Sequence, residues 1–484
     1  LQRVKNEAPV ASVVEPEHPR KRWMRRGIVA CIIVIIVTVV AIVLGLNVGS
    51  QEPSPAELPP TMAPTPLSEE DFLFQLFFPI SGEELLNDGT TSNTISNNTF
   101  LESNETNGMD NPSGGTLSVV EDNATVTATT TTPSPSYQAM QWMLQQDTDE
   151  LFIIMDYRDN PQILIERFIL ATFFFATNGP TDWIDKAGFL SSDMVCDWPP
   201  PNNVTDRNAA LNRVDCNEEA RVIWLRTNDN NVTGTIPKEL GSLELLADLS
   251  LTEGSLEGTL PYELSQLNQL TSLDLNDNAL TGSLHDDEFW DPLRLLQYIS
   301  LARNEFESTI PTGLVQNEDL EVLELSWNKL IGPLPEFSLD ASALRMVQLY
   351  NNEINGTIPS SIYSLRSLEI LYLDNNNLSG TIGTQLGNLR NLHELYFDIN
   401  RLSGSIPTQV GLLTQLRIFS ARLNRIDSTI PSTVSNMNQL ASFAVRFNRL
   451  TGTIPPSIGT LSRTLTSIDL KRNSMSGTVP SELA

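Results

Sequence analysis

With 484 residues, the chain is long enough for one large domain with appended segments. Its net charge of −29 argues against nucleic acid as a partner, because nucleic-acid-binding proteins need a basic surface. The three histidines, His18, His285 and His393, have no nucleophile or acid at the spacing of a catalytic motif. We therefore expect no enzyme activity, no metal site and no cofactor.

The first elements are a basic tail and a long apolar segment. Residues 1–26 carry a net charge of +4, from seven Lys/Arg and three acidic residues, and Gly27–Leu46 then runs without a charge. As a helix that segment is about 30 Å long, the thickness of a bilayer core. A secretory signal has a shorter apolar core of about 7–15 residues, and a buried helix with no polar face is rarer still. We therefore predict a transmembrane helix at residues 27–47.

The basic cluster PRKRWMRR directly precedes this helix. By the positive-inside rule it places the amino terminus in the cytosol and the rest of the chain outside. The sequence thus predicts a cell-membrane protein of the single-pass type II kind. The chain begins with Leu rather than Met, so the cytosolic tail can be longer than these 26 residues.

Residues 48–135 are rich in Ser, Thr, Pro, Asn and acids, too polar to bury a core. They are predicted to form a disordered stalk. One apolar island, Asp71–Ile80, is interpreted as a short helix at the membrane or docked on the folded domain, with a binding motif as the alternative. Seven Asn-x-Ser/Thr sequences outside the cell are candidate glycosylation sites, namely Asn97, Asn104, Asn123, Asn203, Asn231, Asn355 and Asn377.

Residues 136–221 follow the stalk. Two stretches, SYQAMQWMLQQ and PQILIERFILATFFFATNG, show helical apolar spacing. Pro161 suits the start of the second helix and Gly179 its end. This segment is predicted to be mainly helical.

The remaining residues, 222–484, repeat with a period of 24. The stretches Leu344–Pro359, Leu368–Gly383 and Leu392–Pro407 align, and the same register occurs eleven times. Within LxxLxL the paired apolar residues point inward from a short strand, and the residue between them points outward. An Asn follows in every coil except one, where Gly254 replaces it. Each coil is too small to fold alone, so stability must come from stacking, as in a solenoid.

The motif LxxLxLxxNxLxGxIPxxLxxL resembles the plant-type leucine-rich-repeat family over about 260 residues. The resemblance implies an α/β solenoid, a horseshoe of eleven coils with a parallel sheet on its concave face and a short second sheet near GxIP. Members of the family mostly bind, as receptor ectodomains, co-receptors and inhibitors of wall-degrading enzymes. In many such receptors a kinase follows the membrane span, but here the repeats occupy that side and the sequence has no kinase motif.

The resemblance extends to the segment before the first coil. A helix, Trp183, and the cysteines of VCDW and DC are similar to the amino-terminal cap of plant-type repeats. That cap implies a disulfide between Cys196 and Cys216, although an insertion, PPPNNVTDRNAALNR, widens the usual spacing. The extracellular setting favours the bond, and no histidine lies nearby to complete a zinc site. Residues 136–221 are therefore predicted to be the amino-terminal cap.

Aromatic and charged residues gather in the outward columns of coils 5–10. Exposed aromatics beside both charge signs are typical of a binding hot spot, and the family binds on its concave face. The alternative is that aromatics occur there because they are good strand formers. The predicted ligand-binding residues are Trp327, Tyr350, Tyr372, Asp374, Tyr396, Asp398, Arg422 and Arg446.

A second column holds Thr or Ser before the Ile of GxIP in ten coils, with Pro333 as the exception. Regularly spaced threonines suit an ice lattice, and some plant repeats of this family bind ice. We favour the other interpretation, a stabilising second sheet of β-branched residues.

Together these features predict a membrane-anchored, glycosylated recognition protein that binds an extracellular protein, peptide or glycan through the concave face. With so short a tail it would signal only through a partner such as a co-receptor. The alternatives are an inhibitor of secreted polysaccharide-degrading enzymes, a structural or adhesive surface protein, and an ice binder.

Overall fold

The computed structural model describes Leu76 and residues 132–149, 161–186, 188–191, 194–198, 212–339, 341 and 343–481. The chain divides into two units, 1–66 and 67–484. The transmembrane helix predicted at Gly27–Leu46, nearly all of the stalk, and Asn97, Asn104, Asn123 and Asn203 lie outside the described residues. Of the helices that are described, none has the length and apolar character needed to cross a membrane.

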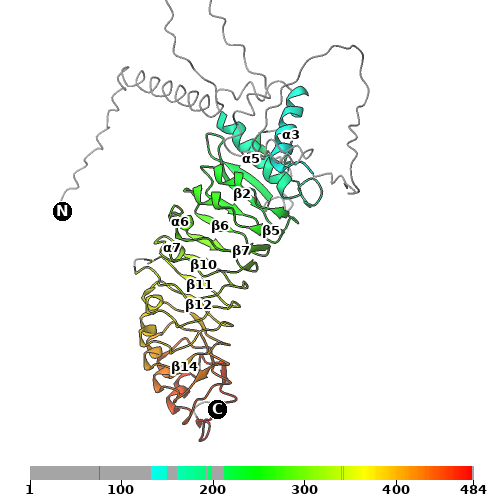
Figure 1. Cartoon of the computed structure of the whole chain (residues 1–484). Coiled ribbons are helices and arrows are strands. Elements are labelled where there is room, and N and C mark those ends of the chain that lie inside the picture. Colours follow the sequence, from blue (N-terminus) through cyan, green and yellow to red (C-terminus); the bar gives the residue numbers. More distant parts are fainter. Residues whose placement is uncertain are drawn as a thin grey trace, which may run out of the picture. The chain divides into compact units, whose positions relative to one another are not determined.

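The repeats form one large sheet of twelve strands. Each of the eleven coils contributes one parallel strand to this sheet, as the sequence predicts. Residues 24 apart pair between neighbouring strands, for example Leu371 with Leu395. Figure 1 shows the coils stacked in chain order, from green beside the cap to red at the last coil. The strands of this sheet are β1 (Asn212–Cys216), β2 (Val222–Thr227), β4 (Asp248–Ser250), β6 (Ser272–Asp274), β8 (Tyr298–Ser300), β10 (Val322–Glu324), β11 (Met346–Gln348), β12 (Ile370–Tyr372), β13 (Glu394–Tyr396), β15 (Ile418–Ser420), β17 (Ser442–Ala444) and β18 (Ser467–Asp469).

A second set of short parallel strands lies near the GxIP segments, as predicted. Four pair in one sheet and two in another, and isolated bridges such as Thr357 with Ser379 connect coils between them. They are β3 (Thr233–Thr235), β5 (Ser255–Thr259), β7 (Ala279–Gly282), β9 (Glu305–Phe306), β14 (Ser403–Gly404) and β16 (Arg425–Ile426).

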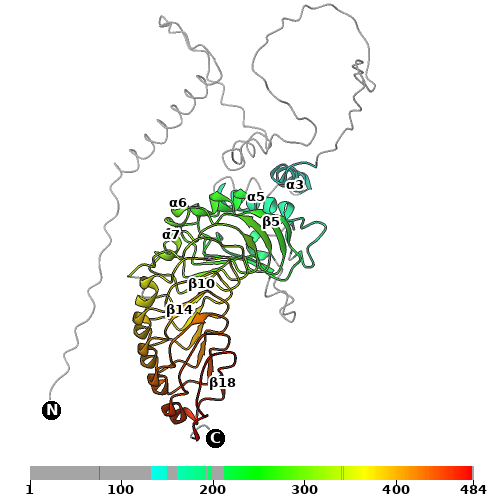
Figure 2. The same cartoon turned by 60° about the horizontal axis from the view of Figure 1, so that its bottom comes forward.

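Among the described residues, nine of the eleven coils have a short helical turn as their third side. Most of these turns begin after the proline of GxIP, whose fixed φ suits the residue before a helical turn. Figure 2 shows them in a row along one side of the coils, opposite the strands. They are η3 (Lys238–Ser242), η4 (Tyr262–Gln266), α6 (Asp287–Trp290), α7 (Thr312–Val315), η5 (Ser360–Ser364), η6 (Thr384–Asn388), η7 (Thr408–Leu412), η8 (Ser432–Asn436) and η9 (Pro456–Leu461).

A ladder of asparagines connects the coils at the turn after each strand of the large sheet. The Asn376 amide donates to the carbonyls of Leu349, Leu373 and Asp374 at 2.8, 3.3 and 3.2 Å. Its oxygen accepts from the Ile354 N–H at 3.0 Å. One side chain thus satisfies four backbone groups on two coils, which water cannot reach in the interior of the stack. The same pattern recurs from Asn278 to Asn473.

The cap covers the first coil. It contains α3 (Pro135–Asp149), α5 (Pro161–Ala176), η2 (Val195–Asp197) and an antiparallel strand, β1, that the sequence did not predict. The buried Glu166 of α5 accepts from the Arg221 side chain at 2.6 Å and from the Val222 N–H at 2.9 Å. The cap thereby supplies hydrogen-bond partners, as well as apolar cover, to the strand β2 that begins the repeats.

The core is one continuous cluster that extends from the cap through the repeats. In the cap it contains a group of packed aromatic rings, in which the centroids of Phe173 and Phe174 each lie 5.0 to 6.4 Å from those of Trp183 and Phe189. Leu76 of the apolar island is helical and packs against the core cluster, which agrees with docking of the island on the folded domain. The other residues of the island lie outside the described ranges.

Candidate functional site

A row of four aromatic rings crosses four consecutive coils on the exposed face of the large sheet, called the sheet face below. The Trp327 and Tyr350 centroids lie 6.5 Å apart, those of Tyr350 and Tyr372 6.1 Å, and those of Tyr372 and Tyr396 4.8 Å. Every pair meets edge to face, the geometry that the ring quadrupoles favour. The residues that the sequence groups together therefore form one contiguous surface, the aromatic row.

The aromatic row is held by polar contacts to neighbouring coils. The Tyr372 hydroxyl donates to the carboxylate of Glu394 on the next strand. Partial burial raises the pKa of both Tyr372 and Tyr396, so both phenols stay neutral donors at ordinary pH. Trp327 stands at the end of the row, 49% exposed, with the Arg303 guanidinium 5.7 Å from its ring centroid.

Asp374 and Asp398 lie beside the aromatic row but differ in availability. Burial, together with the nearby charge of Asp398, raises the pKa of Asp374 to about 6. Asp398 is only 4% exposed, and its carboxylate is occupied: Arg422 donates from Nε and Nη2 at 2.8 and 2.5 Å, its N–H donates at 2.6 Å, and Ser420 donates at 2.7 Å. Asp398 therefore positions Arg422, whereas Asp374 remains partly open to a ligand.

The sheet face changes charge along its length. In coils 2–5 it is acidic, where burial and the charges of Glu324 and Asp248 raise the pKa of Asp274 to about 6. In coils 9–11 it carries Arg422, Arg446 and Lys471. Arg446 lies 3.7 Å from Asp469, beyond hydrogen-bond range, and 5.5 Å from the Phe447 ring centroid.

A third outward column belongs to the same face, and the sequence interpretation omitted it. The first residue of each strand also points outward, because side chains alternate. In coils 5–9 this column contains Glu394 in coil 8 and half-buried apolar side chains in the other four coils, at Val322, Met346, Ile370 and Ile418. The sequence could have identified these residues, because the residue before each buried apolar residue of a strand must point outward.

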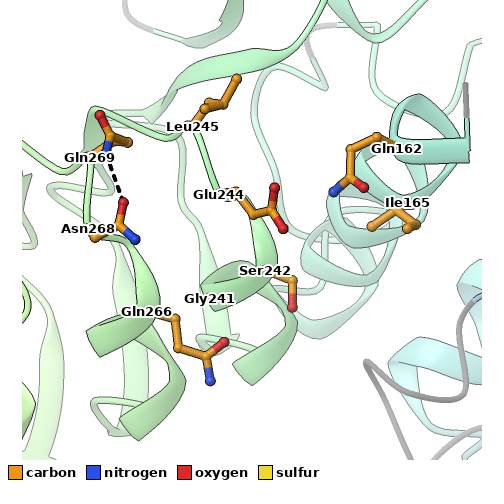
Figure 3. Close-up of a pocket in the computed structure, with 9 residues that line it drawn as sticks. All are labelled: Gln162, Ile165, Gly241, Ser242, Glu244, Leu245, Gln266, Asn268 and Gln269. Atoms are coloured by element: carbon orange, nitrogen blue, oxygen red, sulfur yellow. Dashed lines mark hydrogen bonds between the residues drawn. The ribbon is translucent and has the colours of Figure 1, made fainter. Parts of the chain in front are cut away.

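An open cavity of about 590 Å³ lies on another part of the molecule, between α5 and the first two coils (Figure 3). Amide side chains dominate its lining, with Gln162 from α5 and Gln266, Asn268 and Gln269 from the second coil, around Glu244. In Figure 3 the Asn268 and Gln269 side chains are hydrogen-bonded to each other. Amides both donate and accept, so the cavity suits neutral polar groups; no sequence motif indicated it.

The three sequons within the repeats lie in the turns after the large-sheet strands. Asn355 is exposed and Asn377 half-buried. Asn231 is exposed, but its amide donates to the Asp182 carbonyl of the cap at 2.9 Å. Glycosylation at these sites stays a prediction. The disulfide that the cap resemblance implies is present between Cys196 and Cys216.

Comparisons with known proteins agree with the repeat. The family model "Leucine Rich Repeat" matches residues 367–389. No curated protein matches the chain. The chain is similar to the ectodomain of the Arabidopsis receptor kinase HAESA, solved in complex with the peptide hormone IDA, at 26% identity and a TM-score of 0.52, covering 66% of this chain and 55% of that one.

It is also similar to a plant ice-binding protein, at 25% identity and a TM-score of 0.52, covering 65% of this chain and 99% of that one. The plant peptide hormone receptor RGFR1, solved in complex with RGF2, is 32% identical with a TM-score of 0.48, over 54% of this chain and 45% of that one. The chain spans about half the length of the receptor structures first matched. The 24-residue repeat, the parallel sheet with its asparagine ladder and the likeness to the HAESA ectodomain show that this chain has a leucine-rich-repeat fold.

Proposed function

We propose that this chain is a membrane-anchored extracellular recognition protein without catalytic activity, which binds its ligand non-covalently on the sheet face. Gly27–Leu46 would be the anchor, with the amino terminus in the cytosol, and signalling would require a partner such as a co-receptor. The proposal rests first on the aromatic row, since four half-exposed rings on consecutive coils give a ligand a large and rigid apolar surface.

The charge pattern favours a peptide or protein ligand over a neutral glycan. A peptide lying across the strands, along the stack of coils, would meet acidic groups near Asp274, the aromatic row in the middle, and cations near Arg446. Peptides can place a basic and an acidic residue at such positions, whereas most neutral sugars cannot. The similar HAESA ectodomain was solved with a peptide hormone, which supports the same ligand class.

The test is capture of ligands by the purified full chain from extracellular proteins, a synthetic peptide array and a glycan array. The variant Tyr372→Ala/Tyr396→Ala should lose the ligand while keeping its fold. Tyr262→Ala is a matched control, because Tyr262 is also an exposed tyrosine, but on the helical side of coil 2. Arg422 is left intact, because its removal would leave the buried Asp398 carboxylate without its cation.

Three outcomes would count against peptide recognition on the sheet face. A ligand that the double variant retains places the site elsewhere. A secreted polysaccharide hydrolase as the captured protein supports the inhibitor alternative. Absence of any ligand in all three assays favours a structural or adhesive role.

A second candidate function, ice binding, has one specific observation in its favour. The Thr/Ser column near the second sheet is exposed in all ten coils. The Thr357 methyl packs under Gly380, where a Cβ would lie 2.8 Å from it, and the branched Cβ of threonine limits the rotation of this side chain. The similarity to a plant ice-binding protein supports this use of the column.

The column is interrupted at Pro333, and sugars at Asn355 and Asn377 would stand beside Thr357 and Thr381, so recognition on the sheet face remains the first proposal. Thermal hysteresis and ice recrystallisation assays decide between them. An ice binder would lose activity in Thr429→Lys/Thr453→Lys and keep it in Tyr372→Ala/Tyr396→Ala. No activity in the unmodified chain eliminates this candidate.

A further inference from the structure

The residue before the ladder position has the same unusual backbone in every coil. Its φ lies between 50° and 58° in all eleven coils, a left-handed conformation that Gly, Asn and Asp adopt most easily. Coils 6 and 7 use Asn351 and Asn375 there. Coils 8, 9 and 10 instead carry Ile399, Leu423 and Phe447, and for a β-branched residue such as Ile399 this conformation is a genuine outlier.

These three apolar side chains are exposed, at 48%, 41% and 41%. They lie on hydrogen-bonded neighbouring coils: the Ile399 N–H donates to the Arg422 carbonyl at 2.8 Å and the Leu423 N–H to the Arg446 carbonyl at 2.9 Å. Coils repeat at about 4.8 Å, so the three side chains form one short line, called the apolar stripe below. The repeat does not require apolar residues here, because asparagine occupies the same position in the two coils directly before them.

Two rows of cations border the apolar stripe. On the side of the sheet face lie Arg422, Arg446 and Lys471, and on the other side lie the exposed Arg401, Arg425 and Arg449. Arg446 and Arg472 both lie over the Phe447 ring, 5.5 and 5.7 Å from its centroid. From Asp398 to Arg472 the sequence has nine Lys/Arg and three Asp, within a chain whose net charge is −29. Two of those aspartates already lie close to Arg422 and Arg446.

We propose that the apolar stripe is a docking surface for an acidic amphipathic segment of a protein partner. Two observations point the same way: apolar residues kept at a costly backbone position, and a positive border in an acidic protein. The repeat imposes a left-handed conformation on Ile399 that asparagine would adopt at lower cost, and such outliers cluster at active sites and ligand clamps. No Asn-x-Ser/Thr sequence follows Asn377, so predicted sugars leave this surface open.

The spacing also defines the partner. Apolar residues at i and i+3 or i+4 of a helix lie about 5–6 Å apart, close to the repeat of the coils. A helix with such apolar residues and flanking Asp or Glu would place its carboxylates against the two rows of arginines. The apolar stripe adjoins the aromatic row, which ends at Tyr396 on the strand of coil 8, but shares no residue with it.

The test uses the variant Ile399→Asn/Leu423→Asn/Phe447→Asn of the full chain. Asparagine suits the left-handed position, so the variant should fold and melt at a higher temperature than the unmodified chain. A random peptide library displayed on phage, selected on the unmodified chain, should yield acidic peptides with apolar residues at helical spacing. Their affinity should fall about tenfold or more for the triple variant. Glu253→Asn, the same position in coil 2, is the control and should change neither result.

Distinct results overturn the proposal. It fails if no acidic peptide is enriched, or if the enriched peptides bind the triple variant equally well. It fails in favour of a membrane if the substitutions reduce binding to phosphatidylserine vesicles but not to peptides, and in favour of self-association if they change only the sedimentation of the chain. Tyr372→Ala/Tyr396→Ala should keep the peptides of the apolar stripe, so failure here and failure of the proposed function are distinguishable.

Discussion

Arg422 on one coil holds the buried carboxylate of Asp398 on the coil before it with both its side chain and its backbone N–H, at 2.5 to 2.8 Å. The bond raises the pKa of the Arg422 guanidinium. It also joins two strands at the point where the aromatic row ends and the basic coils begin. The pair therefore stabilises the fold and fixes the orientation of the Arg422 guanidinium on the sheet face.

Replacing Arg422 by Ala should lower the free energy of unfolding by about 3 kcal/mol, because it leaves a buried carboxylate without its cation. Arg425→Ala removes an exposed arginine from the next turn and should change stability by no more than about 0.5 kcal/mol. Urea unfolding of the two variants measures the difference. Equal effects would show that Asp398 does not depend on Arg422.

The asparagine ladder gives a second stability prediction. Asn376→Ala leaves the Ile354 N–H without its acceptor and removes one of two donors from each of three carbonyls, so it should cost about 1–3 kcal/mol. Asn388→Ala, an exposed asparagine of η6, should have little effect. Thermal melts of both variants test this, and a ladder variant as stable as the Asn388 variant would contradict the role assigned to the ladder.

The repeated fold could be predicted from the sequence because each repeat contains the residues that determine its local structure. Paired leucines specify the three-residue strand, an asparagine specifies the turn, and a proline precedes the helical turn. The exception at Gly254 has a structural cause that the sequence does not reveal. A Cβ there would lie 2.7 Å from the Val232 carbonyl and 2.8 Å from the Asn278 side chain, so no asparagine fits. The cap strand β1 was also missed, because its residues, NRVDC, are mostly polar, although it pairs with β2 directly across the loop 217–221.

The candidate site was only partly predictable, for reasons of depth and backbone conformation. The position of residues in the repeat identified Tyr350, Tyr372 and Tyr396. It did not distinguish Asp398 from Asp374, although the Asp398 carboxylate is fully hydrogen-bonded and that of Asp374 is not. Column position also did not reveal that Ile399 occupies a left-handed turn. Burial and φ depend on how neighbouring coils pack, which a single repeat does not encode.

The cap disulfide should stabilise the cap locally. In the chain-entropy model, a bond between residues 20 apart is worth about 3 kcal/mol. Cys196→Ala/Cys216→Ala should therefore make the cap the first part of the domain cleaved in limited proteolysis, while the repeats from coil 2 onward keep their protection. Mild reduction of the unmodified chain should reproduce the cleavage pattern. Cleavage that begins within the repeats instead would show that the disulfide does not control the cap.

Asp374 should make the stability of the domain depend on pH. Its pKa is raised from the ordinary value near 3.8 to about 6, chiefly by burial, so the folded state binds its proton more tightly than the unfolded chain does. The contribution of this group to stability is therefore most favourable below about pH 4 and declines as pH rises toward 6, because ionisation is penalised only in the folded state.

Asp374→Asn removes that penalty. At pH 7 the variant should be more stable than the unmodified chain by about 1 kcal/mol, a value reduced from the full shift because the group is partly open to water. Below pH 4 the two should converge. Urea unfolding at pH 4 and pH 7 measures both differences, and Asp427→Asn, an exposed carboxylate in coil 9, is the control. An advantage of the Asp374 variant that is equal at the two pH values would mean that the substitution acts through packing and not through the proton.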